Sequence, residues 1–170
     1  TGRPFVTTYH GAYNQKSWLK GAYNSVMARG DVVIANSGYT ADLIRTRHPF
    51  AEGRIVTIHR GTDLAAFADP GLPERAAALR RQWGVPEGAR IILQLARLTG
   101  WKGQAVVIDA LAQLASRPDC VAVLAGDAQG REDYVAGLRA RIAELVLEGR
   151  VFLPGHCSDV PAAMEAADVV

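Results

Sequence analysis

Apolar residues in this chain form two patterns, short continuous runs and longer stretches with helical spacing. The runs are rich in Val, Ile and Leu, which is typical of parallel strands covered on both faces. Such strands are predicted at residues 4–9, 31–35, 54–58, 91–95, 121–125 and 151–153, with the start of another at 167–170. Helices are predicted at residues 16–29, 39–47, 73–83, 103–115, 134–146 and 160–167, with Ser37 as the N-cap of the second.

Strands and helices therefore alternate along the chain. This order favours βαβ units with right-handed crossovers and mostly parallel sheets. The expected fold class is α/β, built from Rossmann-like units. The segment 61–72 contains Pro70 and Gly71 and interrupts the alternation, so it is the best candidate for a domain boundary.

Charge and composition narrow the class of protein. The 170 residues include 19 Lys and Arg against 17 Asp and Glu, and the basic residues are scattered. Nucleic acid is not expected as a partner, because binding its backbone needs a concentrated basic face. Cys120 and Cys157 lie in no metal-binding or disulfide pattern, which fits a reducing cytoplasm. We expect no signal peptide or transmembrane span, and we expect both ends to lie inside a longer protein.

The most informative polar residues are Arg97 and Lys102, which follow the predicted strand 91–95 and precede a predicted helix. In an open α/β sheet, ligands bind outside the carboxyl ends of the strands. Arg presents a planar fork to two phosphate oxygens, and Lys presents a compact charge. Two cations in this loop therefore suggest a diphosphate site, although on their own they fit solvated loop residues equally well.

Two later loops, Gly126-Asp127 and Gly155-His156, also follow predicted strands and should open onto the same crevice. Glycine lets the backbone approach a ligand, and main-chain groups there can bind the edge of a base. The same glycines are equally well explained as simple turns. The sequence has no G-x-G-x-x-G fingerprint after a strand, which disfavours a dinucleotide-dependent oxidoreductase, and it has no Walker motif.

Several motifs occur in the order and spacing of one known family. The similar segments are Arg60-Gly61-Thr62-Asp63 through Phe67 (P-x-G-[IV]-D…F), Leu95-Ala96-Arg97-Leu98 with Lys102-Gly103 (G-R-L…K-G), Leu124-Ala125-Gly126-Asp127 (V-G-D-G), and 151–170 (V-x-F-x-G…D-V-P-x-x-x-x-A-A-D-V). Together they resemble the retaining GT-B fold glycosyltransferases of group 1, family 4, over essentially the whole chain. The resemblance implies transfer of a sugar from a nucleotide diphosphate donor.

The resemblance also implies a domain organisation and a set of site residues. Residues 1–60 would be the last part of an acceptor-side domain, 61–72 the linker, and 73–170 the first part of the donor-binding domain. The donor site would be lined by Arg97, Lys102, Gly126, Asp127 and His156. His10 would project toward the donor sugar as the catalytic residue, whereas His48 and His59 match no motif and are expected to be structural.

The expected donor is a UDP- or GDP-sugar, and the expected acceptor is lipid-linked or a saccharide. No metal ion and no other cofactor is expected. The resemblance implies a role in bacterial cell-envelope polysaccharide or lipopolysaccharide assembly in the cytoplasm, at the inner face of the inner membrane. Peripheral membrane contact would involve a weak basic patch of Lys16, Lys20 and Arg29.

Two alternatives stay open at the level of sequence. One is a nucleotide-sugar epimerase, because such enzymes use the same GT-B architecture. The other is a non-catalytic fragment that only binds nucleotide. The family's E-x7-E motif would begin beyond Val170, and two glutamates eight positions apart there would favour the transferase.

Overall fold

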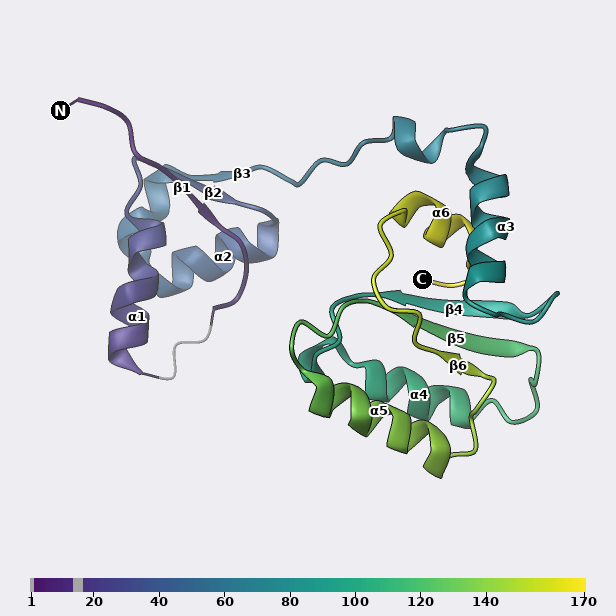
Figure 1. Ribbon diagram of the computed structural model, residues 1–170. Helices are drawn as coiled ribbons and strands as arrows, with labels where there is room; N and C mark the ends of the chain where they lie inside the picture. Colours follow the sequence, from purple (N-terminus) through teal and green to yellow (C-terminus); the bar gives the residue numbers. More distant parts are fainter. Residues whose placement is uncertain (1, 14–16) are drawn as a thin grey trace. The chain divides into compact units, whose positions relative to one another are not determined.

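The computed structural model describes residues 2–13 and 17–170, and the chain divides into two compact units, Thr1–Thr62 and Asp63–Val170. Each unit contains a three-stranded parallel sheet (Figure 1). The α/β class predicted from the sequence is confirmed. The division falls within the segment 61–72, and the assignment of the two units to acceptor and donor stays a prediction.

Unit 1 (Thr1–Thr62) has its strands in the order β1-β2-β3. The strands are β1 (Val6–Tyr9), β2 (Val32–Ala35) and β3 (Ile55–Thr57). The helices are α1 (Trp18–Ser25), a 3₁₀ helix at Val26–Ala28, α2 (Gly38–Arg47) and a 3₁₀ helix at Pro49–Arg54. The core forms where side chains of the sheet meet those of α2, and it combines the large ring of Tyr9 with the smaller side chains of Val33, Ala35, Ala41 and Ile44.

The two α-helices of unit 1 agree with the predicted helices to different degrees. Ser37 caps α2 as predicted, because its Oγ accepts a hydrogen bond from the Thr40 amide at 3.1 Å. The helix predicted at 16–29 is shorter in the structure, where α1 ends at Ser25 and a 3₁₀ turn follows. Lys16, one of the residues of the expected basic patch, lies outside the described residues.

His48 ends α2 and is buried, with 4% of its surface exposed. Its ring lies 6.0 Å from that of Tyr9 and 5.7 Å from that of Phe50, and within the described residues its Nε2 has no hydrogen-bond partner. Burial lowers the pKa of His48 below its ordinary value, and the nearby charges of Arg47 and Arg29 lower it further. His48 is therefore a neutral core residue, in agreement with the structural role expected for it.

Because the imidazole of His48 is buried in its neutral form, we expect unit 1 to lose stability in acid. Because the unfolded chain takes up the proton first, the contribution of His48 is complete above about pH 6.5 and is lost as the pH falls below that value. We expect the His48→Leu variant to lose a few degrees less in Tm between pH 7 and pH 5.5 than the native chain, as measured by calorimetry. His59→Gln, which changes an exposed histidine, is the matched control. Equal pH dependence of His48→Leu and the native chain would contradict the prediction.

Unit 2 (Asp63–Val170) has the strand order β4-β5-β6. The strands are β4 (Arg90–Leu95), β5 (Cys120–Ala125) and β6 (Val151–Phe152). The helices are α3 (Leu72–Gln82), α4 (Gln104–Ala112), α5 (Glu132–Glu144), α6 (Val160–Glu165) and 3₁₀ helices at Ala65–Phe67 and Gly100–Lys102. Figure 1 shows α4 and α5 along one face of the sheet and α3 and α6 on the other.

The central strand β5 is buried along its whole length, which explains why its sequence is apolar at every position. Val121, Val123 and Ala125 belong to the cluster that contains residues of α3 and α6. Cys120, Ala122 and Leu124 belong to the cluster that contains residues of α4 and α5. Alternate side chains therefore fill two different cores, as expected for a parallel strand covered on both faces.

The predicted strand at 167–170 is reduced to a single parallel bridge in the structure. Val169 pairs with Ile92, and the Leu93 amide donates to the Val169 carbonyl at 2.8 Å. The Asp168 carboxylate accepts a hydrogen bond from the Ile91 amide, also at 2.8 Å. The segment therefore lies beside β4, whose other edge is occupied by β5.

Candidate functional site

Three loops meet at the carboxyl edge of the sheet in unit 2, and main-chain hydrogen bonds join them. The bonds are Ala96 N to Ala125 O (3.1 Å), Leu98 N to Asp127 O (3.0 Å) and Gly126 N to Gly155 O (2.8 Å). The pairing of the strands therefore continues past the ends of β4, β5 and β6. This edge holds the loop backbones in fixed positions relative to one another.

At Gly126, two of these loops come too close together to leave room for a side chain. A Cβ added there would lie 1.8 Å from the carbonyl oxygen of Ala96 and 2.7 Å from its carbonyl carbon. Main-chain atoms that belong to the continued strand pairing cannot turn aside as a flexible side chain would. Gly126 thus has a packing role that differs from both the turn and the ligand approach considered from the sequence.

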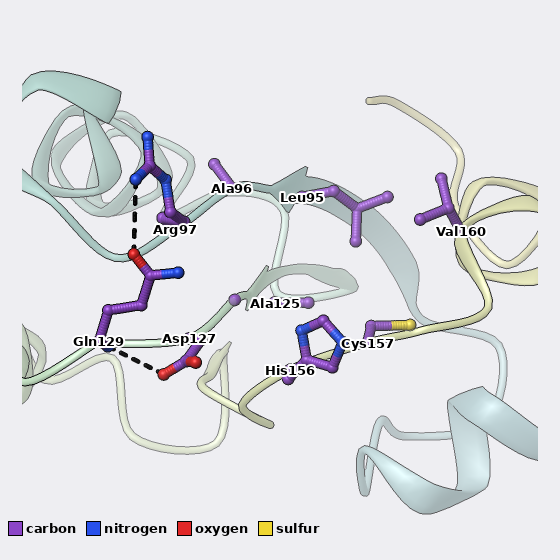
Figure 2. A pocket seen from close by; sticks show the side chains of 10 residues that line it. Leu95, Ala96, Arg97, Ala125, Asp127, Gln129, His156, Cys157 and Val160 are labelled. Carbon is purple, nitrogen blue, oxygen red and sulfur yellow. Dashed lines mark hydrogen bonds between the residues drawn. The ribbon is translucent and has the colours of Figure 1, made fainter. Parts of the chain in front are cut away.

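A pocket of about 310 Å³ opens at this edge. Its lining consists of Leu95, Ala96, Arg97, Ala125, Gly126, Asp127, Gln129, His156, Cys157 and Val160. Figure 2 shows Arg97 and Gln129 facing each other at one end of the pocket, with Val160 at the other. The structure therefore brings together Arg97, Gly126, Asp127 and His156, four of the five residues expected at the donor site.

Arg97 is exposed at the mouth of the pocket, and its side chain is only lightly held. Its Nη1 donates a long hydrogen bond of 3.4 Å to Oε1 of Gln129. The Asp127 carboxylate accepts a hydrogen bond from the main-chain N–H of Gln129 at 2.9 Å. This bond supports a turn in which Gln129 has a φ of 49°. A guanidinium carries five N–H donors, so Arg97 can still bind a multiply charged anion.

Lys102 is the expected site residue that does not line the pocket. Its ammonium lies 4.2 Å from the ring centroid of Trp101, whose side chain is 71% exposed. A cation over an indole ring is attracted by the negative face of the ring. The backbone of Lys102 is fixed, because its carbonyl accepts from the Gln94 side chain at 2.7 Å. Lys102 thus combines a flexible side chain with a fixed main chain.

Two glutamines that the sequence analysis did not single out position this loop. Gln94 bonds to the Lys102 carbonyl, and the fully buried Gln104 donates to the Arg97 carbonyl at 3.0 Å. The Tyr134 hydroxyl donates to Oε1 of Gln104 at 3.1 Å. The sequence offered one indication of this role: Gln94 is a long polar residue inside an apolar strand, and Gln104 is one at the start of an apolar helix. Buried amide groups are usually hydrogen-bonded. Both polar atoms of the Gln104 side chain are bonded here, whereas Oε1 of Gln94 is buried with no hydrogen-bond partner in the described residues.

His10, the expected catalytic residue, belongs to unit 1 and is exposed at the carboxyl end of β1. Its main-chain carbonyl accepts a hydrogen bond from Nδ2 of Asn36 at 2.9 Å. Asn36 directly follows β2, the neighbouring strand. The role of His10 toward a donor sugar stays a prediction.

Two family models match the chain. Residues 76–170 match the model described as glycosyl transferases group 1, and residues 1–66 match the model described as glycosyltransferase family 4. The chain belongs to the group 1 glycosyltransferases. The family predicted from the sequence is thereby confirmed.

Curated relatives of this group 1 chain carry the name D-inositol 3-phosphate glycosyltransferase. The protein from Mycolicibacterium gilvum is 34% identical over 148 residues, which are 85% of this chain and 32% of that protein. The one from Salinispora arenicola is 31% identical over 157 residues, which are 85% of this chain and 35% of that protein. The chain therefore spans about a third of the length of these relatives.

Solved structures of glycosyltransferases resemble this group 1 chain over nearly all of its length. Anabaena HepE in complex with UDP-glucose has a TM-score of 0.80 and 33% identity, covering 98% of this chain and 45% of that chain. A glycosyltransferase from Rickettsia africae has a TM-score of 0.80 and 32% identity, covering 96% and 43%. WaaG, described as involved in lipopolysaccharide biosynthesis, shares the fold at 18% identity, with a TM-score of 0.70.

Within residues 2–13 and 17–170 of the group 1 chain, every helix falls short of the length and apolar composition that crossing a membrane requires. No group of three or more His, Cys, Asp and Glu side chains in the same residues could hold a metal ion.

Proposed function

We propose that unit 2 of this group 1 glycosyltransferase binds the diphosphate of a nucleotide-sugar at the pocket beside Arg97, and that the full-length protein transfers the sugar with retention. The carrying observation is the exposed Arg97 guanidinium at the mouth of a pocket formed by the exit loops of three parallel strands. HepE, whose structure contains UDP-glucose, is 33% identical to this chain. This similarity favours UDP over GDP as the nucleotide.

The chemistry asked of these residues is the stabilisation of a leaving group. As the bond between the sugar and the β-phosphate breaks, negative charge grows on the diphosphate. Arg97 and Lys102 would stabilise that charge from a preorganised loop, with no metal ion required. Lys102 would leave the face of Trp101 to reach the phosphate, and its flexible stem permits this movement.

For the acceptor we propose a saccharide or lipid-linked saccharide of bacterial cell-envelope polysaccharide or lipopolysaccharide assembly, in the cytoplasm. The support is the family resemblance. The names of the curated relatives make D-inositol 3-phosphate a further acceptor to test.

The first test is a calorimetric titration of the chain with UDP, GDP and ADP. We expect saturable binding of UDP, with weaker binding of the other two. A folded chain that binds none of the three would contradict the proposed site. Preferential binding of GDP would support the proposed diphosphate site but identify guanine, instead of uracil, as the base.

Product analysis of the full-length protein separates the transferase from the epimerase alternative. A transferase releases UDP in an amount that equals the sugar joined to the acceptor. An epimerase instead yields an altered sugar or sugar nucleotide without any acceptor. Chromatography of UDP-glucose reactions with and without acceptor measures this difference, and formation of an altered sugar or sugar nucleotide without acceptor would exclude the proposed reaction.

Helix α1 supports the peripheral membrane contact that we propose for unit 1. Its residues Trp18, Leu19 and Tyr23 are 79%, 65% and 78% exposed, whereas Asn24 and Ser25 are buried. The helix thus presents large apolar and aromatic side chains outward, with Lys20 also exposed beside them. Aromatic residues and nearby cations are typical of surfaces that lie at a membrane interface.

This arrangement predicts binding to anionic vesicles. We expect the native chain to sediment with vesicles that contain phosphatidylglycerol, and the Leu19→Glu, Tyr23→Glu double variant to lose most of this binding, because buried apolar area drives it. Val106→Glu, which changes another exposed apolar residue in unit 2, serves as the control. Unchanged sedimentation of the double variant would exclude α1 as the contact.

A further inference from the structure

The carboxyl ends of the three strands in unit 1 bring His10, Asn36 and Arg60 together. Tyr9 pairs with Ala35 in the parallel register of β1 and β2, so the next residues, His10 and Asn36, leave the sheet side by side. The pairing of β2 and β3 continues through a hydrogen bond from the Ile58 amide to the Ala35 carbonyl at 2.9 Å. Arg60 follows two residues later.

The backbone of His10 is fixed by a chain of side-chain hydrogen bonds that ends in the core. Asn36 donates from Nδ2 to the His10 carbonyl at 2.9 Å, and its Oδ1 accepts from the Thr40 hydroxyl at 2.7 Å. Thr40 is buried, with 2% of its surface exposed, and its amide is capped by Ser37. The position of His10 is therefore tied to the first turn of α2.

The imidazole of His10 has a separate partner. Nη2 of Arg60 lies 3.0 Å from Nδ1 of His10. A guanidinium has only N–H donors and stays protonated, so Nδ1 must be the acceptor of this bond. A neutral imidazole whose Nδ1 accepts carries its proton on Nε2, and a doubly protonated ring cannot form the bond. The contact therefore selects one tautomer of His10.

We infer that Arg60 is a positioning residue that holds the His10 ring with its Nε2–H as the group available to a ligand. His10 is then a hydrogen-bond donor through Nε2, suited to a hydroxyl oxygen of the donor sugar or to negative charge that develops there. A histidine without this partner exchanges between tautomers and presents a donor only part of the time. The role toward sugar rests on the proposed function, whereas the tautomer itself does not.

The test is nitrogen-15 NMR of the histidine side chains in the chain without any nucleotide, at about pH 8. The chain has four histidines, so a His10→Gln variant identifies the His10 signals. We expect the native Nδ1 to show the shift of an unprotonated nitrogen and Nε2 that of a protonated one. A His10 ring that shows averaged shifts, or a proton on Nδ1, would overturn the inference.

Three substitutions separate the hydrogen bond from charge and from general damage. Arg60→Met removes the donor, and the two ring shifts should move toward the averaged values of free histidine. Arg60→Gln keeps an N–H donor and should recover part of the native pattern. Arg45→Met, at an exposed arginine of the same unit that pairs with Asp42, should change nothing. Native His10 shifts in a folded Arg60→Met variant would overturn the inference.

The outcome is independent of nucleotide binding. If UDP fails to bind but the tautomer responds to Arg60, the proposed function fails and the positioning contact stands. If UDP binds but the tautomer does not respond, the contact fails and the donor site stands.

Discussion

Replacement of Gly126 with Ala is expected to destabilise unit 2 by about 3 kcal/mol and to abolish nucleotide binding. The added Cβ would lie 1.8 Å from the Ala96 carbonyl oxygen, which is main chain. Relief requires the exit loops of β4 and β5 to separate, which stretches the hydrogen bonds from Ala96 to Ala125 and from Leu98 to Asp127. The same loops line the pocket, so stability and binding should fall together.

Thermal unfolding monitored by calorimetry, followed by UDP titration, measures both effects. A loss of this size lowers Tm by about 10 °C or more for a domain of this length. Gly137→Ala is the matched control, since Gly137 lies in α5 with nothing within 4 Å of an added Cβ. Ala in place of Gly inside a helix should stabilise the unit by about 0.5–1 kcal/mol. A Gly126→Ala variant with native Tm and native UDP affinity would show that the close approach is dispensable.

Arg97→Ala is expected to weaken UDP binding at least tenfold, which corresponds to about 1.4 kcal/mol. Hydrogen bonds to charged groups contribute more than neutral ones, and a guanidinium can bind two phosphate oxygens at once. Arg97→Lys keeps the charge and loses the fork, so its affinity should lie between those of the native chain and Arg97→Ala. In the full-length protein, Arg97→Ala or Lys102→Ala should lower kcat by about 10²- to 10³-fold.

Calorimetry of the chain and steady-state kinetics of the full-length protein check these expectations. Arg81→Ala is the control, because Arg81 is an exposed arginine of α3 that does not line the pocket. Loss of affinity in both arginine variants would indicate a general effect of positive charge. Native binding and turnover in Arg97→Ala would remove Arg97 from the site.

Much of the fold follows from local sequence pattern. A run such as that of β5, apolar at every position, is compatible with a strand buried on both faces, and the helical spacing around Ile108 and Leu111 places α4 against it. Parallel strands end at one edge of a sheet, so strand order alone places Arg97, Gly126, Asp127 and His156 in the same neighbourhood. The pocket is thus largely a consequence of topology.

The details that local pattern could not supply depend on side chains from distant positions. His10 and Arg60 are 50 residues apart, and neither has a neighbour in sequence that indicates their contact. Gln104 and Tyr134 are 30 residues apart and fix the loop of Arg97 from two helices. The clash that requires Gly126 arises from another strand's backbone, so the sequence around Gly126 shows a turn and nothing of the Ala96 carbonyl.

The contact between Lys102 and Trp101 places a natural fluorophore in the loop that we propose to bind the diphosphate. An indole with an ammonium 4.2 Å from its ring centroid emits in a strongly polar local field, and the movement proposed for that ammonium toward a phosphate would remove the field. The other two tryptophans differ in setting, because Trp83 is buried and Trp18 belongs to unit 1. A chain with both of these replaced by Phe would therefore report the position of one lysine side chain as a change in fluorescence, in real time and without any added label.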